Sequence, residues 1–100
     1  MILVIGSIRC PVDQLEAVKA PLTALINATR AEDGCIQYNY GEDVLDPGLF
    51  RVSEVWRDRA AFDAHLKAPH IPPWRAASAE LGLNGRSLTV WESDQGQPVK

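Results

Sequence analysis

Two histidines follow a strand-like aromatic segment within residues 54–70, EVWRDRAAFDAHLKAPH. An imidazole in a low-dielectric cavity can take a proton from a phenol near neutral pH. His65 comes three residues after Phe62, which places it at the inner edge of the apolar stripe of a helix. We therefore expect His65 to act as a general base. The alternative is a structural histidine bonded to a backbone carbonyl.

His70 follows Pro69 near the expected start of a further helical segment. It is the second candidate for the catalytic base, and a hydrogen bond at the helix terminus is the alternative. The two histidines are i, i+5 across a proline break, whereas one helix face presents a metal-binding pair at i, i+4. We therefore expect no metal site.

Aromatic and apolar side chains on two strands and two helices are candidates for the walls of a cavity. Trp56 shares one strand face with Val52. It either packs in the core or joins the catalytic site, where it would stack on an aromatic substrate and orient a substrate oxygen with its indole N–H. The residues that we expect to contact the substrate are Tyr38, Val52, Phe62 and Trp74.

Glu54 lies on the same strand face as Trp56, among apolar neighbours. A carboxylate in such surroundings must find a donor or be neutral. We expect an ion pair at a subunit interface with one of three arginines, Arg9, Arg51 or Arg57. Arg75, beside Trp74, either places a cation at the mouth of the cavity or is solvated, and we expect it to be solvated.

The first third of the chain predicts one strand and one helix. Residues 2–10 are apolar on both faces at their start, which predicts a strand that is covered on both sides. Asp13 and Glu16 predict a capping box at the start of the helix. Pro21 predicts a kink and Gly34 the stop of that helix. The apolar stripe of the helix comprises Leu15, Val18, Leu22, Leu25 and Ile26.

The remainder predicts a hairpin, further helix and a last strand. Strands at 35–42 and 49–57 should pair around Asp46-Pro47-Gly48, and Asp58 should cap a second helix that ends at Pro69. Pro72-Pro73 should delay or distort the helical segment that follows, before a strand at 86–93. This βαββαβ order predicts an α+β, ferredoxin-like antiparallel sheet with two helices on one face. A second subunit should cover the other face.

Composition restricts the function classes. The 100 residues predict a single domain at 1–93 followed by a polar C-terminal tail at 94–100. The 10 basic and 13 acidic residues are scattered, so we expect neither nucleic acid nor a membrane surface as a partner. No apolar run approaches the ~20 residues that cross a bilayer, and we expect a cytoplasmic protein. Cys10 and Cys35 should lie on strands too far apart to form a disulfide.

Several short pieces, in this order and spacing, resemble the antibiotic biosynthesis monooxygenase family. They are Ala31-Glu32-Asp33-Gly34-Cys35, Glu54-x-Trp56, Asp58, Ala61-Phe62-Asp63-Ala64-His65-Leu66 and Pro69-His70. The resemblance implies a homodimeric α+β barrel that oxygenates phenols, anthrones or quinols with O₂ and without a cofactor. The chain has neither a Gly-rich dinucleotide loop nor a metal-ligand cluster at familiar spacing, so we expect no flavin and no metal.

Some residues of this chain differ from the family pattern, and these differences indicate which substrate class is expected. Aligned on Trp56, Val52 and Phe62 stand where anthrone-oxidising relatives have asparagine and tyrosine. The pattern of Trp56, His65 and His70 is more similar to the quinol-oxidising branch. We therefore predict a cofactor-independent monooxygenase of a small aromatic quinol or polyphenol. The alternative is a non-catalytic, dimeric small-molecule-binding or stress-related protein that uses the same cavity.

Overall fold

One antiparallel sheet forms the centre of the computed structural model, which describes residues 1–100. The strand order is β2-β3-β1-β4, as the ferredoxin-like topology requires. All neighbouring strands run antiparallel. The strands are β1 (Ile2–Arg9), β2 (Cys35–Glu42), β3 (Leu49–Trp56) and β4 (Asn84–Glu92).

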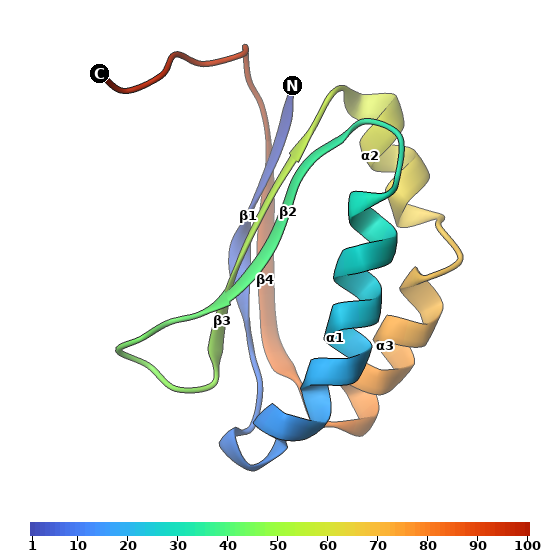
Figure 1. Ribbon diagram of the computed structural model, residues 1–100, viewed down its shortest axis with the longest axis vertical. Helices are drawn as coiled ribbons and strands as arrows, with labels where there is room; N and C mark the ends of the chain where they lie inside the picture. The colour runs from blue at the N-terminus through green and yellow to red at the C-terminus, as the bar shows by residue number, and fades with distance from the viewer.

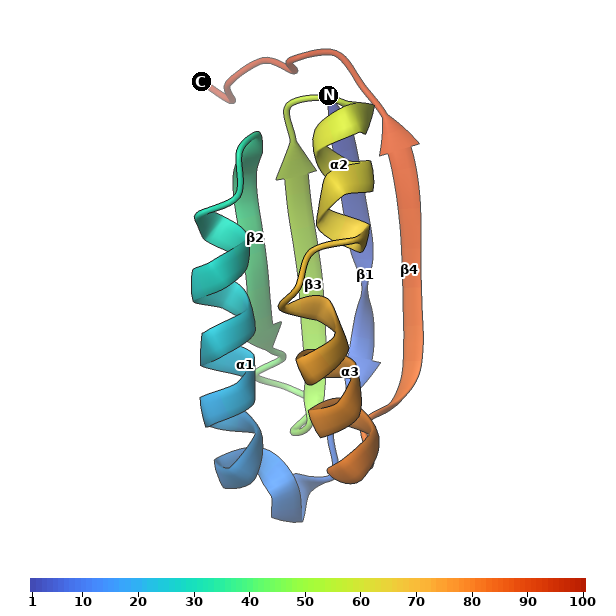
Figure 2. The same ribbon diagram turned by 90° about the vertical axis from the view of Figure 1, so that its right-hand side faces the viewer.

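Three helices, all on one face of the sheet, complete the fold (Figure 1). They are α1 (Leu15–Arg30), α2 (Arg59–Leu66) and α3 (Ile71–Glu80). Helix α1 lies on the side of β2, whereas α2 and α3 follow one another along the middle of the sheet (Figure 2). The predicted α+β class and the placement of the helices on one face are therefore confirmed. None of the helices is both long and apolar enough to cross a membrane.

Both ends of α1 differ from their prediction. A 3₁₀ turn, η1 (Val12–Gln14), precedes the helix, so Asp13 and Glu16 form no capping box. The turn satisfies the Gln14 N–H with the carbonyl of Pro11 at 2.9 Å and so replaces a side-chain cap. The helix then runs through Pro21 without a break.

Gly34 does not stop α1, which ends four residues earlier at Arg30. It lies in the turn into β2 with φ at +83°, a conformation that favours glycine. A Cβ at this position would lie 2.6 Å from the Cβ of Ala61 in α2. Gly34 therefore allows the close approach of the turn to α2.

The second half of the chain follows the prediction more closely. The hairpin of β2 and β3 turns at Gly48, where φ is +87°. The Asp58 carboxylate caps α2 by accepting from the Ala61 N–H at 2.9 Å. The proline pair neither delays nor distorts α3, because Pro72 and Pro73 occupy its first turn, where a backbone N–H has no intrahelical partner. The result is two helices, α2 and α3, where one interrupted helical region was predicted.

The core lies between the sheet and the helices. Val18, Leu22 and Leu25 of the predicted α1 stripe are buried there. The opposite face of the sheet is bare in this chain and carries Ile5, 50% exposed, and Trp91, 48% exposed. Both cysteines are unpaired, as predicted.

Candidate functional site

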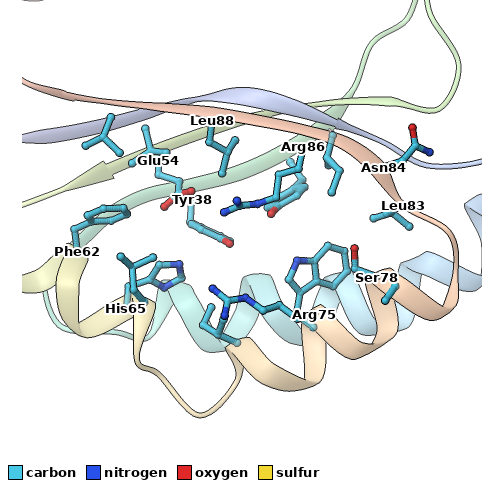
Figure 3. Close-up of a pocket in the computed structure, with 18 residues that line it drawn as sticks. Tyr38, Glu54, Phe62, His65, Arg75, Ser78, Leu83, Asn84, Arg86 and Leu88 are labelled. Carbon is cyan, nitrogen blue, oxygen red and sulfur yellow. The ribbon is translucent and has the colours of Figure 1, made fainter.

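A cavity of about 550 Å³ opens between the sheet and helices α2 and α3 (Figure 3). It is in the size range of small-molecule sites. Of the 18 residues that line it, 12 are hydrophobic. A site of this composition suits a small, largely apolar ligand that is oriented by a few polar groups.

Aromatic side chains from three elements form much of the wall. Tyr38 and Tyr40 project from the inner face of β2, with ring centroids 5.7 Å apart. Tyr40 meets Trp74 of α3 edge-on at 6.0 Å, and Phe62 lines the cavity from α2. Such a wall offers stacking and edge-to-face contacts to a planar aromatic ligand.

His65 enters this aromatic cluster from α2 and is only 4% exposed. Its ring centroid lies 4.7 Å from that of Trp56 and 5.4 Å from that of Tyr38, which it meets edge-on. The sequence indicated an inner-edge position on α2, but the structure buries the side chain almost completely. Figure 3 shows the imidazole at the end of the cavity that Phe62 also lines.

One carboxylate oxygen binds both histidines. Glu32 Oε2 lies 2.7 Å from His65 Nδ1 and 2.8 Å from His70 Nε2. An ionised carboxylate only accepts hydrogen bonds, so each of these nitrogens is the protonated one. The free nitrogen of a neutral His65 is therefore Nε2, which has no hydrogen-bond partner in the protein. Glu32 thus fixes the tautomer that leaves a basic nitrogen to the cavity.

Glu32, His65 and His70 could also bind a metal ion. The ligand atoms of Glu32, His65 and His70 all lie within 4.8 Å of one another. The structure therefore brings together two histidines that their spacing did not indicate as a metal-binding pair, because Glu32 bridges them from the turn between α1 and β2. Two imidazoles and a carboxylate are a donor set for divalent transition metals. A metal would have to replace both N–H protons and both hydrogen bonds to Glu32.

Trp56 and Val52 pack behind the cavity wall. Trp56 is fully buried and Val52 is 1% exposed, and neither lines the cavity. The indole N–H, which was expected to orient a substrate oxygen, is donated to Glu54 Oε1 at 2.9 Å instead. Trp56 therefore meets the site through its contacts with His65 and Glu54.

Glu54 does line the cavity, and its expected ion pair is wrong for this chain. The three arginines named for it bind aspartates instead, in the pairs Arg9–Asp46, Arg51–Asp43 and Arg57–Asp33. Burial raises the pKa of the Glu54 carboxyl, and the hydrogen bond from Trp56 lowers it by less. Burial favours the neutral carboxyl because no cation is bonded to it.

The two tyrosines are donors rather than bases. Burial is the largest cause that raises the pKa of Tyr38 and of Tyr40, and the rise is large for Tyr38. Both hydroxyls therefore stay protonated at neutral pH. Among the groups predicted as the base, His65 is the one that lines the cavity with a free nitrogen.

Four of the seven predicted site residues line the cavity: Tyr38, Phe62, His65 and Trp74. His70 is joined to the site through Glu32. Glu32 itself was not predicted as a site residue, because 33 residues separate it from His65 and no periodicity links them. Its only signal was its place in the first of the short motifs shared with the family.

Comparison with known proteins identifies the family and agrees with this fold. The model of the antibiotic biosynthesis monooxygenase family matches residues 1–77, and the chain belongs to that family. "Putative monooxygenase Rv0793" of Mycobacterium tuberculosis is 40% identical over 78% of this chain and 76% of its own length. An uncharacterised protein of Synechocystis is 36% identical over 98% of this chain and 67% of its own length.

Solved structures show the same architecture. A crystal structure from Deinococcus radiodurans, described as a putative antibiotic biosynthesis monooxygenase, has a TM-score of 0.91. It is 26% identical, and the match covers 100% of this chain and 99% of that one. The structure of Rv0793 has a TM-score of 0.82 at 35% identity, over 97% and 98% of the two chains. The family and these relatives support a monooxygenase-type function.

Proposed function

We propose that this chain is a cofactor-independent monooxygenase that oxidises a small aromatic quinol or polyphenol with O₂. The observation that carries the proposal is the imidazole of His65, which lines an aromatic cavity while Glu32 holds its Nδ1. A non-catalytic binding protein could use the same cavity, but it has no need of an oriented base inside it.

The reaction balances without an external reductant. A hydroquinone that becomes a hydroxyquinone gives up four electrons, and O₂ accepts all four. One oxygen atom enters the ring and the other leaves as water. Removal of a phenolic proton makes the substrate a better one-electron donor to O₂, so the protein has to deprotonate the ring, orient it and exclude water. None of these steps requires flavin or metal.

Each cavity residue has a role in this scheme. His65 Nε2 accepts the phenolic proton, and the Glu32 carboxylate compensates the positive charge that the ring then carries. Tyr38 and Tyr40, which stay protonated, donate to oxygen atoms of the substrate or of reduced O₂. Phe62 and Trp74 hold the planar ring.

The protein in this proposal is a cytoplasmic homodimer whose other partners are the aromatic substrate and O₂. The bare sheet face carries Ile5 and Trp91, both about half exposed, and a second copy would bury them. The formal net charge of −3, without a basic cluster, gives no attraction to nucleic acid or to an anionic membrane.

The test is O₂ uptake with a panel of hydroquinones in metal-free buffer. His65→Gln keeps a polar side chain of similar reach but removes the base, and should lower the rate roughly 10²–10⁴-fold. Asp63→Asn, on the exposed side of the same helix, is the matched control and should keep the wild-type rate. Wild-type turnover in His65→Gln excludes His65 as the base. No uptake with any hydroquinone overturns the proposed activity.

A further inference from the structure

Two arginines differ from the rest in having no partner. Five of the seven in the sequence bind an acceptor: Arg9, Arg30, Arg51, Arg57 and Arg59. Arg75 and Arg86 make neither a hydrogen bond nor an ion pair within the chain, and both line the cavity. The unpartnered guanidinium groups are therefore concentrated at the one place where a ligand would bind.

The two side chains reach the cavity from opposite walls. Arg75 projects from α3 and Arg86 from β4, and both point into the cavity toward the region of the Tyr38 hydroxyl (Figure 3). Burial is the main influence on the pKa of Tyr40 and of Glu54, and the charge of Arg86 lowers both. The Arg86 charge therefore acts on two groups that line the cavity.

The opposing negative charge in the cavity is small. Glu54 is the one carboxyl that lines it, and its burial raises its pKa. Its Oε1 already accepts the Trp56 indole N–H. Arg75 and Arg86 are exposed and their N–H groups are free, so an anion between them could accept charge-assisted hydrogen bonds from both.

The cavity also has two chemically different ends. His65 and Phe62 lie at one end, whereas Ser78 and Asn84 lie at the other, beyond the two arginines (Figure 3). A ligand with a phenolic hydroxyl at His65 would place its far substituent among cations and neutral polar groups. Arginine binds a carboxylate through two parallel N–H···O bonds, which a neutral substituent cannot match.

We propose that Arg75 and Arg86 form an anion subsite, and that the substrate is a phenol or quinol that carries a carboxylate. The identity of the ligand as a substrate rests on the proposed function. The anion subsite itself is a binding property that does not depend on catalysis. A ligand that cannot be oxidised therefore tests the subsite independently of the activity.

The probes are 2-naphthoate and 2-naphthamide, planar ligands of the same shape of which only the first is an anion. Calorimetric titration should give a dissociation constant at least roughly tenfold lower for 2-naphthoate. Arg75→Gln and Arg86→Gln should each weaken 2-naphthoate roughly tenfold and leave 2-naphthamide unchanged. Arg51→Gln, whose guanidinium pairs with Asp43 on the hairpin, is the control and should change neither.

Equal affinity of the wild type for the two probes overturns the subsite, as does unchanged 2-naphthoate affinity in both cavity variants. Thermal unfolding of each variant confirms that the fold is intact. If 2-naphthoate binds in an arginine-dependent way but no hydroquinone gives O₂ uptake, the anion subsite is supported and the proposed oxygenase activity is rejected. If neutral hydroquinones give O₂ uptake but 2-naphthoate does not bind more tightly than 2-naphthamide, the oxygenase activity is supported and the anion subsite is rejected.

Discussion

His65 Nδ1 and Glu32 Oε2 lie 2.7 Å apart, although one belongs to α2 and the other to the turn after α1. A carboxylate that holds one imidazole nitrogen directs the other toward a substrate. Glu32 is therefore a positioning residue, which acts on the reaction through His65.

Glu32→Gln should lower the rate roughly 10²–10⁴-fold, because a neutral amide neither selects the Nδ1–H tautomer nor compensates the imidazolium. The loss should fall on kcat, since Glu32 does not line the cavity. Nitrogen NMR should show Nδ1–H on the His65 ring of the wild type and a mixture of its tautomers in the variant. A loss confined to KM, with unchanged tautomers, contradicts the positioning role.

The pH dependence of the His65→Gln rate tests the chemistry of proton removal. A phenol ionises unaided near pH ~10. The variant should therefore regain much of its lost O₂ uptake as pH rises toward that value, because the substrate no longer needs a base. A rate deficit that is the same at all pH values excludes a role for His65 in deprotonation.

Truncation of His65 should also affect stability. An edge position on the helix would make His65→Ala nearly neutral, but the side chain is 4% exposed and packs on Trp56. We expect a loss of roughly 2–4 kcal/mol in the free energy of unfolding, from the cavity created and the unpaired Glu32. Urea denaturation measures it, and a loss below roughly 0.5 kcal/mol would show that the packing contributes little. Activity comparisons should therefore use His65→Gln.

Glu54 predicts a stability change with pH. Because burial raises its folded-state pKa, folding favours the protonated carboxyl. This contribution is fully present below the unfolded pKa and is lost as pH rises through the folded one. Glu54→Gln keeps an acceptor for Trp56 and should be more stable than the wild type at pH 8 by the order of 1 kcal/mol, but not at pH 4. Urea denaturation at both values checks this, and an equal effect at both contradicts it.

Chelation tests the cluster of Glu32, His65 and His70. In the proposed mechanism these groups are joined by hydrogen bonds, so EDTA should leave the O₂ uptake rate unchanged. Loss of activity on chelation, with recovery on adding one divalent metal, would identify the cluster as a metal centre. His70→Ala should then abolish that recovery, because a third ligand is missing.

The bare face of the sheet predicts an obligate-like dimer with a total interface above ~2,000 Å². Sedimentation equilibrium at micromolar concentration should give twice the chain mass of 11.0 kDa. Ile5→Asp, which places a charge in that face, should shift the protein toward monomer. A wild type that sediments only as an 11.0 kDa species contradicts the dimer.

Local patterns in the sequence predicted the parts of the site that depend on one element. The helical spacing around Phe62 placed His65 at the inner edge of its helix, and Tyr38 was expected to contact the substrate; both line the cavity. Strand alternation also placed Trp56 inward, but it could not show that the side chain packs beneath the cavity wall. Alternation identifies the face of a strand and not the depth at which α2 covers it.

The parts that depend on contacts between distant elements were not predicted. Glu32 comes from a turn whose own residues give no reason to expect a histidine partner. Arg75 was expected to be solvated and is exposed, but its position opposite Arg86 was not predicted, because it depends on how the fold places α3 and β4 on opposite walls of one cavity. The start of α1 was misplaced because a 3₁₀ turn competes with side-chain capping over only three residues.

The chain around Pro69 is not helical, so this region forms two short helices, α2 and α3, in place of one long helix. His65 belongs to the helix before this break and Arg75 to the helix after it. The four residues between α2 and α3 therefore set the distance between the proton acceptor, His65, and the guanidinium of Arg75. Relatives in which the connection between α2 and α3 is longer should accept longer ligands, and those in which it is shorter should accept shorter ones, even where both the histidine and the arginine are kept.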